Sequence, residues 1–263
     1  MVDKFIGTLR VMSLSFLAGI VLLSTVSAAH AAPFTFLVFG DNRGNDEVYS
    51  DLITKANQEQ GISFGIAAGD LVPAGLQSEY QHYMKLESRF KFKVYHVIGN
   101  HDTVNGGGER FEKYLGPRYY SFDYEGYHFV MIDNAGWRGL GKTQWDWLQR
   151  DLDAHKSFPM FVFMHKPLTD VSGFYVNHVF TPEREAVRLA RTLKNYYIQM
   201  VFGGHIHGYA RGMSYGLPEI ITAGAGAPLY MPYSAGGFYH YIRVCVGDSA
   251  KNIAYDVVKL YEE

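Results

Sequence analysis

The most informative segment of this sequence is Val94-Tyr-His-Val-Ile-Gly99-Asn100-His101-Asp102, an apolar run that ends in a glycine and three polar side chains. Short apolar runs of this kind are typical of buried strands. Four more runs in the chain also end in polar side chains. The predicted strands are Phe34–Phe39 before Asp41, Ile62–Ala68 before Asp70, Lys93–Ile98 before Asn100, Met160–Met164 before His165, and Ile198–Phe202 before His205 and His207.

The polar ends of these five runs are expected to meet in one place. In α/β proteins, ligands bind outside the carboxyl ends of the sheet strands. Carboxylates, imidazoles and an amide oxygen in one crevice form a set of hard to borderline metal ligands. A single glycine–aspartate pair is a common turn, but five such strand ends favour a shared metal site. The glycines before four of these side chains fit tight turns with close backbone approach.

Helix patterns lie between most of the predicted strands. Amphipathic segments are predicted at Glu47–Gln60, Ser78–Phe90, Gln144–His155 and Pro182–Tyr196. The last segment carries capping signals, with Thr181 as the N-cap, Pro182 at the first helical position and Glu185 completing a capping box.

The later part of the chain is mostly strand-like. A hairpin is predicted from Tyr119–Asp123 and His128–Asp133, and further strands at Glu219–Thr222, Tyr239–Val246 and Asn252–Leu260. Alternating strands and helices, followed by mainly strands, predict an α/β fold in which two packed mixed sheets are flanked by helices. No repeat, low-complexity tract or linker interrupts residues 32–263, so we expect a single domain there.

Four blocks of the sequence resemble the motif blocks of the calcineurin-like metallophosphoesterases, in the same order along the chain. They are Gly69-Asp70, Gly99-Asn100-His101-Asp102, His165 and Gly204-His205-Ile206-His207. The resemblance covers residues 34 to about 230. It implies a four-layer α/β/β/α sandwich and a site for two divalent or trivalent metal ions, with Mn, Fe and Zn as candidates.

The resemblance also implies a role for each polar residue of these blocks. Asp70 would bridge both metals. Asp41 and His207 would hold the first ion, and Asn100, His165 and His205 the second. His101 would be the general acid beside the leaving oxygen, and Asp102 would orient it.

The chemistry of phosphate ester hydrolysis suits these residue types. Two cations about 3.5 to 4 Å apart hold a bridging water as hydroxide and clamp the phosphoryl oxygens during an in-line displacement. Asn100 supplies a neutral oxygen, which keeps the site cationic enough to attract a dianion. A histidine titrates near neutral pH, which suits proton transfer to a departing alkoxide. The expected substrates are phosphate mono- or diesters, either small molecules or macromolecules.

The first block departs from the family pattern. It reads Gly40-Asp41-Asn42-Arg43-Gly44, so Arg43 stands where the usual motif has a histidine ligand. A guanidinium does not lose its proton and cannot ligate a cation. The purple acid phosphatases, a related branch, also lack that histidine but have a tyrosine three residues after the bridging aspartate. Here that position is Pro73.

Two consequences of Arg43 remain open at this point. Its forked guanidinium could contact the substrate phosphate, or it could form a structural ion pair that faces away from the site. The missing histidine also opens a second function: an exported binding protein with a metal-stabilised phosphate pocket and weak or lost catalysis. The enzyme is the favoured hypothesis, because a decayed site has no reason to retain a general acid such as His101.

Composition excludes several other classes of protein. The 263 residues include 24 Lys and Arg, 26 Asp and Glu, and 48% hydrophobic residues, which is typical of a folded globular protein. Cys245 is the only cysteine, so a disulfide scaffold and a cysteine-based zinc site are excluded. A near-neutral charge without basic clusters argues against nucleic acid as a partner.

The first 31 residues have the pattern of a secretory signal peptide. Lys4 and Arg10 precede an apolar run from Val11 to about Val26, and Ala29-His30-Ala31 supplies small residues for cleavage. A membrane anchor is the alternative. Removing residues 1–31 changes the formal net charge from −2 to −3. No later stretch is long and apolar enough to span a bilayer, so a secreted or periplasmic protein is expected.

Two further motifs match catalytic patterns but lack the right context. Residues 136–143 match the phosphate-binding loop G-x-x-x-x-G-K-T, but Trp137 and Leu140 put bulk where backbone amides should face phosphate. Residues 212–216 match the serine-hydrolase elbow G-x-S-x-G, but a strand pattern follows where a helix is needed. A hairpin turn at Tyr215-Gly216 is the better interpretation.

Two loops are candidates for substrate contact. Residues 168–180 contain Tyr175 and His178, and residues 224–233 contain Tyr230 and Tyr233. Loops above a rigid site often contact substrate. The chain has 20 tyrosines, so an aromatic residue in a loop does not identify a leaving group.

Overall fold

The computed structural model describes residues 32–262, and the predicted signal peptide over residues 1–31 lies outside this range. In the described range the chain forms two mixed β-sheets. The first sheet contains β1 (Phe34–Phe39), β2 (Ile62–Ala67), β3 (Lys93–His96), β10 (His240–Val246) and β11 (Ile253–Lys259). Its strand order is β11-β10-β1-β2-β3, with β1, β2 and β3 parallel and the other two pairings antiparallel.

The second sheet is built in the same mixed way. It contains β4 (Tyr120–Tyr124), β5 (Tyr127–Ile132), β6 (Met160–Met164), β7 (Ile198–Gly203), β8 (Tyr209–Ser214) and β9 (Leu217–Thr222). The strand order is β4-β5-β6-β7-β9-β8, and the four central strands are parallel. The antiparallel strands β4 and β8 form its edges.

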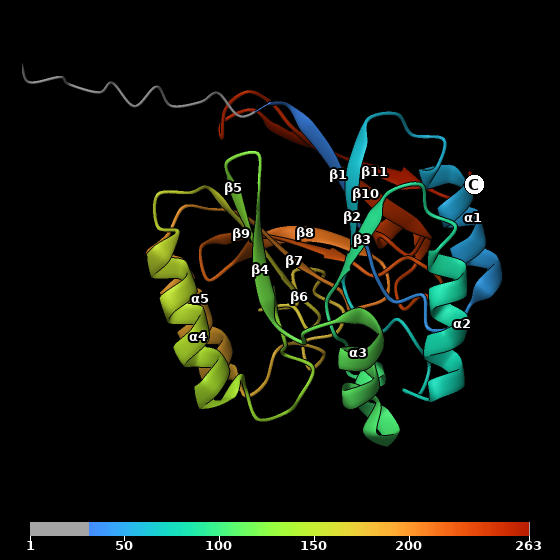
Figure 1. The fold of residues 1–263 in the computed structure, drawn as a ribbon, viewed down its shortest axis with the longest axis horizontal. Coiled ribbons are helices and arrows are strands. Elements are labelled where there is room, and N and C mark those ends of the chain that lie inside the picture. Colours follow the sequence, from blue (N-terminus) through green and yellow to red (C-terminus); the bar gives the residue numbers. More distant parts are fainter. Residues whose placement is uncertain (1–31, 263) are drawn as a thin grey trace, which may run out of the picture.

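The two sheets pack face to face between two groups of helices (Figure 1). Phenylalanines fill the space between the sheets: the ring of Phe36 lies 5.2 Å from that of Phe161 and 5.5 Å from that of Phe129, between ring centres. The helices α1 (Asp46–Ala56), α2 (Gln77–Glu87) and α3 (Gly107–Leu115) pack on the first sheet. The helices α4 (Gly141–Ala154) and α5 (Glu183–Leu193) pack on the second. The predicted α/β fold with four layers is therefore confirmed.

Three details of the secondary structure differ from the sequence-based prediction. Thr181 does not cap α5: the N-cap is Pro182, without a side-chain cap, and the Glu185 carboxylate instead accepts a hydrogen bond from Trp145 Nε1 at 2.8 Å. The tertiary contact with α4 therefore replaces the predicted capping box. Helix α3 was not predicted, although its Phe111, Tyr114 and Leu115 have helical spacing. Strand β8 precedes the predicted hairpin turn but was not itself predicted.

The elbow-like motif at residues 212–216 is part of a hairpin, as expected. Ser214 ends β8, Leu217 begins β9, and Tyr215 and Gly216 form the turn, both with positive φ. The Ser214 hydroxyl is buried against the Glu219 carboxylate, so it is no exposed nucleophile.

The direction of the parallel strands sets the position of the polar side chains. Strands β1, β2 and β3 run together in one sheet, and β5, β6 and β7 in the other. The loops that leave β1, β2, β3, β6 and β7 carry the predicted ligands. Within residues 32–262, no helix has both the length and the apolar character needed to cross a membrane.

Candidate metal centre

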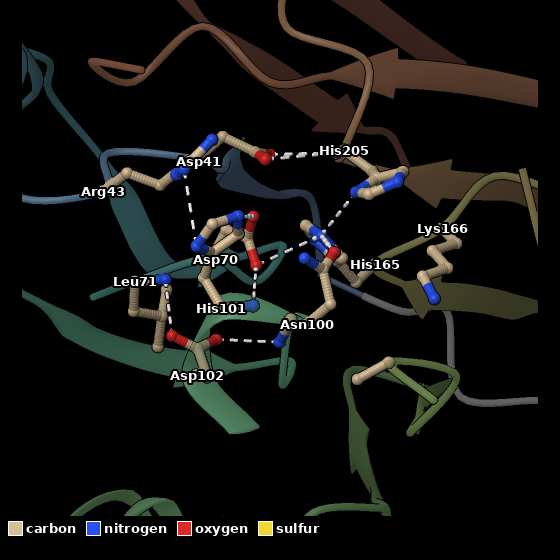
Figure 2. Close-up of polar contacts among 12 residues, drawn as sticks. Asp41, Arg43, Asp70, Leu71, Asn100, His101, Asp102, His165, Lys166 and His205 are labelled. Atoms are coloured by element: carbon tan, nitrogen blue, oxygen red, sulfur yellow. Dashed lines mark hydrogen bonds and ion pairs between the residues drawn. The ribbon is translucent and has the colours of Figure 1, made fainter. Parts of the chain in front are cut away.

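The predicted ligands of the second ion lie together at the ends of β2, β3, β6 and β7 (Figure 2). The Nε2 atom of His165 is 3.3 Å from Oδ1 of Asp70, 3.1 Å from Nδ1 of His205 and 3.1 Å from Oδ1 of Asn100. A cation needs several donor atoms at separations of this size. These four side chains therefore form one group of potential ligands.

The predicted ligands of the first ion form an adjoining group. Nε2 of His207 lies 3.5 Å from Oδ1 of Asp41, and ligand atoms of Asp41, Asp70 and His207 all lie within 4.8 Å of one another. Asp70 belongs to both groups, because ligand atoms of Asp70, His165 and His205 also lie within 4.8 Å of one another. The chain thus brings all six predicted ligands together, with Asp70 at the shared position.

The imidazole rings are oriented as metal ligands are. Nδ1 of His165 donates to the carbonyl of Ala68 at 2.9 Å, and Nδ1 of His207 donates to the carbonyl of Pro228 at 2.7 Å. When each ring is neutral, these bonds leave Nε2 as the nitrogen without a proton, and this atom faces the aspartates. Backbone carbonyls fix the tautomer of metal-binding histidines in the same way. The residues present therefore fit a pair of metal ions.

The electrostatics of the cluster favour a positive charge among the carboxylates. Burial acts to raise the pKa of Asp70, but the charge and hydrogen bond of His165, with a smaller contribution from His101, hold that pKa well below its usual range. Burial acts to lower the pKa of His165, yet the charges of Asp70 and Asp41 raise it to about 9. Burial and the neighbouring charge of His165 lower the pKa of His205 to about 2. A bound cation would replace the His165 proton.

The backbone is strained at three of the predicted ligands. Asp41, Asp70 and His205 have φ values of 63°, 51° and 67°. Left-handed conformations cost residues other than glycine free energy and occur often at functional sites. A Cβ atom on Gly99 would lie 2.1 Å from the backbone nitrogen of Asp70, so the sharp turns also need glycine neighbours. The predicted close backbone approach is confirmed at this position.

His101 lies at the rim of the cluster, in a well-defined orientation. Its backbone N–H donates to Oδ1 of Asp70 at 2.8 Å, and its ring Nδ1 donates to the carbonyl of Pro73 at 2.7 Å. The side chain is 28% exposed, and Nε2 lies 3.9 Å from Oδ2 of Asp70. Nε2 is therefore the ring nitrogen that can exchange a proton with a ligand.

Asp102 is expected to orient His101, and its carboxylate binds backbone amides rather than the imidazole ring. The buried Asp102 carboxylate accepts hydrogen bonds from the backbone N–H groups of Gly99, Leu71 and Val72 at 2.7, 2.8 and 3.0 Å. It thereby fixes the loop whose next residue, Pro73, holds the imidazole. Asp102 acts on His101 through the backbone, because its own oxygens are taken up by three amides.

Arg43 lines the cavity above the cluster together with Asp70, Asn100 and His101. Its Nη2 is 3.4 Å from Nδ1 of His101, which already donates to Pro73, so this contact brings two donor groups together. No ion pair within residues 32–262 involves Arg43. The guanidinium is thus available to an anion in the cavity. The alternative, a structural ion pair, would need an acidic partner for Arg43, and the described part of the chain provides none.

Several residues at the site were not predicted from the sequence. The buried amide of Asn134 accepts from the backbone N–H groups of His165 and Lys166, both at 3.0 Å, and so fixes the end of β6. The cavity is also lined by Trp137 and by His178 and Tyr230. Tyr230 stacks on His207 with ring centres 4.0 Å apart. His178 and Tyr230 come from the two loops singled out in the sequence, whereas no sequence signal distinguished Asn134 or Trp137.

The phosphate-loop match at residues 136–143 is not built as a phosphate cradle. Lys142 is highly exposed and pairs with Asp146 one turn later on α4. The carbonyl of Gly136 accepts a hydrogen bond from Nζ of Lys166 at 3.1 Å. The loop therefore presents a carbonyl to a buried cation instead of amides to an anion.

Comparison with known proteins agrees with this site. The sequence model for calcineurin-like phosphoesterases matches residues 34–209. Purple acid phosphatase 22 of Arabidopsis thaliana is 35% identical over 98 residues, which are 35% of this chain and 21% of that protein. The chain spans between about a fifth and a quarter of the length of the curated relatives it matches.

Solved structures share the fold at low sequence identity. A purple acid phosphatase from yellow lupin (Lupinus luteus) seeds superposes with a TM-score of 0.71 at 16% identity, covering 88% of this chain and 52% of that one. A dimetal phosphatase from Danio rerio superposes with a TM-score of 0.66 at 14% identity, covering 87% of this chain and 97% of that one. With the family match over most of the described residues and the motif residues gathered at one site, this chain belongs to the calcineurin-like phosphoesterase family.

Proposed function

We propose that this chain is an exported metal-dependent phosphoesterase that hydrolyses phosphate mono- or diesters. The observation that carries the proposal is the pair of adjoining ligand groups that share Asp70. Two metal ions, of which Mn, Fe and Zn are candidates, would be held by this aspartate together with one set of ligands each. Family membership and the shared fold with a dimetal phosphatase support the proposal.

Each group of residues has a distinct task in this proposal. Asp41 and His207 hold one ion, and Asn100, His165 and His205 hold the other, with Asp70 between them. Bound cations supply the positive charge that activates water and neutralises the phosphoryl oxygens. The chain's own net charge is slightly negative, so attraction of a phosphate ester depends on these local cations and on Arg43.

His101 is the proposed general acid. Its Nδ1 is held by the Pro73 carbonyl, which directs Nε2 towards the side of the cavity where Asp70 lies. When protonated, Nε2 can donate a proton to the departing alkoxide. Arg43, beside it, is positioned to bind a phosphoryl oxygen through its fork of N–H groups.

The central test is Asp70→Asn. We expect this substitution to lower both metal content and hydrolysis of a chromogenic phosphate ester by more than about 100-fold. Replacing a residue that only supports a metal ligand already lowers metal affinity or activity by about 10- to 100-fold. Metal analysis and steady-state kinetics of the purified chain, after loading with each candidate metal, measure both quantities. Asp146→Asn, an exposed aspartate on α4, is the matched control. Full activity of Asp70→Asn would refute the proposed centre.

The substitution of Arg43 for a first-site histidine supports a second candidate function. In this case the chain would be an exported binding protein that holds one metal ion and phosphate without turnover. Metal stoichiometry and ester hydrolysis, measured on the same sample, separate the two. One tightly bound ion and no hydrolysis with any of several metals favours the binding protein, whereas two ions with turnover favours the enzyme.

Export is proposed from the N-terminal pattern. We expect the mature chain to begin at Ala32 and to occur outside the cytoplasm. N-terminal sequencing of the protein from fractionated cells measures both. A membrane-bound product that retains residues 1–31 would instead support the anchor. Nucleic acid is not proposed as a partner.

A further inference from the structure

An unusually exposed tryptophan lies at the metal centre. Trp137, in the loop after β5, has 69% of its surface exposed and lines the same cavity as Arg43 and His101. The cavity has a volume of about 200 Å³. Large aromatic side chains bury much surface when they pack, so a ligand that occupies this cavity can gain free energy by covering the exposed indole in its wall.

Lys166 supports the tryptophan from within the protein. Its ammonium group lies 3.9 Å from the centre of the Trp137 ring and donates to the carbonyl of Gly136 at 3.1 Å. The lysine itself is fully buried, and Asn134 holds its backbone through bonds of 3.0 Å to N–H and 2.6 Å to C=O. The contact with Lys166, which follows β6, therefore holds the indole in place. A ligand that binds to the indole does not have to supply the free energy needed to order this side chain.

A second anchored aromatic residue lines the same cavity. Tyr230 stacks on His207 at 25° between ring planes, and its backbone carbonyl accepts a hydrogen bond from the hydroxyl of Tyr175 at 2.7 Å. The His178 ring lies 5.9 Å from that of Tyr230, close to perpendicular to it. The wall of the cavity thus contains fixed aromatic rings as well as metal ligands.

From this arrangement we infer that the site selects phosphate esters whose leaving group carries a neutral planar aromatic ring, with Trp137 as the specificity-determining residue. The inference rests on the proposed phosphoesterase function. A cavity of this volume is smaller than the 300–1,000 Å³ of sites that enclose drug-sized ligands. It has room for the phosphoryl group and part of a leaving group, so the remainder of the leaving group can lie against the exposed indole in the cavity wall.

The position of Lys166 decides between two kinds of group that bind tryptophan. Indole rings bind both aromatic rings and cations such as quaternary ammonium groups. Here one cation already lies against the ring, and it would repel a second one on the opposite face. A neutral aromatic leaving group is therefore favoured over a cationic one.

The test compares benzyl phosphate with cyclohexylmethyl phosphate. Both release a primary alkoxide on a ring of similar size, but only benzyl phosphate carries a planar aromatic ring. We expect wild-type kcat/KM to favour benzyl phosphate by about two- to tenfold, the effect of one aromatic pair. Trp137→Leu should bring this ratio close to one. Trp147→Leu, a half-buried tryptophan on α4 that contacts Tyr119, should leave it unchanged.

Lys166 is a positioning residue for the indole. Lys166→Met removes the cation and the bond to Gly136, and we expect it to lower the benzyl preference and shift the fluorescence emission of Trp137. Replacing the lysine also removes the repulsion of cations, so hydrolysis of phosphocholine relative to cyclohexylmethyl phosphate should rise in this variant. An unchanged ratio for both substrate pairs would contradict the positioning role.

Binding of phosphonates separates a failure of this inference from a failure of the proposed function. Calorimetry on the metal-loaded chain gives the Kd of benzylphosphonate and of cyclohexylmethylphosphonate, which need no turnover. Suppose esters are hydrolysed, but Trp137→Leu changes neither the kcat/KM ratio of the two esters nor the Kd ratio of the two phosphonates. The inferred aromatic contact is then wrong, and the proposed phosphoesterase function stands. If no ester is hydrolysed but benzylphosphonate binds more tightly, and loses that advantage in Trp137→Leu, the contact stands and the enzyme does not.

Discussion

His101 and Arg43 show how single residues divide the work at the proposed site. The imidazole is tied to a backbone carbonyl by one nitrogen and presents the other to the cavity, whereas the guanidinium has no ion-pair partner in the described part of the chain. The proposed proton donor and the proposed anion-binding group thus lie side by side. The proposed chemistry predicts different kinetic effects when each is replaced.

His101→Gln should slow hydrolysis most for esters with poor leaving groups. Loss of a general acid lowers the rate of hydrolysis by about 10²- to 10⁴-fold. The rate falls less for an ester whose leaving group departs without being protonated. Metal content should be retained, because the ring is not among the proposed ligands. Kinetics over a series of esters with leaving groups of graded basicity measure this, with the exposed His82→Gln as control. Equal losses across the series would count against His101 as the acid.

Arg43→Ala should raise KM. A hydrogen bond between charged groups contributes about 1.5–3 kcal/mol, which corresponds to about 10- to 100-fold in substrate affinity. Inhibition by inorganic phosphate should weaken by the same factor, and both follow from steady-state kinetics. If both kinetic constants stay at their wild-type values, the guanidinium has only a structural role.

At the scale of the elements, the loops after the strands depend on the close packing of glycines. A Cβ atom on Gly204, after β7, would lie 2.5 Å from Oδ2 of Asp41 and 2.8 Å from the carbonyl of Ala68. The loop after β7 and the loop after β1 approach one another only because this position has no side chain. The candidate ligands from the two sheets thus come together through the contact between these loops.

Gly204→Ala should therefore lower metal content and activity together, while the chain still folds. The added methyl group would push Asp41 away from His207, and a bad contact of this kind costs about 1–3 kcal/mol. Metal analysis and circular dichroism measure the two effects. Gly136→Ala, whose Cβ would have nothing within 4 Å, is the control for metal content. Unchanged metal content in Gly204→Ala would show that the loops have room to adjust.

At the scale of the whole molecule, His240 joins the two sheets. It lies on β10 of the first sheet, is fully buried, and its Nε2 accepts a hydrogen bond from the hydroxyl of Thr222 on β9 of the second sheet at 3.1 Å. Nδ1 donates to the carbonyl of Phe238 at 2.9 Å. Burial lowers the pKa of His240 from 6.5 to about 4, because the charged ring would lose its hydration.

This lowered pKa predicts acid sensitivity of the fold. Above pH 6.5 the ring is neutral in both states, so its contribution to stability is fully present. As the pH falls from 6.5 to 4, the unfolded chain binds a proton that the folded chain does not, and about 3 kcal/mol of unfolding free energy is lost. His240→Gln should reduce this pH dependence. Urea unfolding at pH 7.5 and 4.5, with a chelator throughout, measures the change in unfolding free energy, and His82→Gln is the control. If wild type and His240→Gln lose the same unfolding free energy between these two pH values, the prediction is contradicted.

Much of the fold class and of the candidate ligand set could be predicted from local patterns in the amino-acid sequence. Apolar runs that end in glycine and a polar residue mark strand ends, and the α/β rule places such ends together, so Asp70, Asn100 and His165 could be predicted to meet. The motif blocks also pointed to His101. These features are local, because each depends on a few consecutive residues.

The packing of the folded chain is needed to identify the distant residues that line the candidate site. It directs the Asp102 carboxylate to backbone amides, it replaces a predicted helix cap at Glu185 by a contact with Trp145, and it places Trp137 and Tyr230 in the cavity. The strand pattern does not predict these contacts, since they depend on how segments far apart in the chain pack together. A local pattern fixes where a strand ends, but the packing of the sheets fixes what its last side chain contacts.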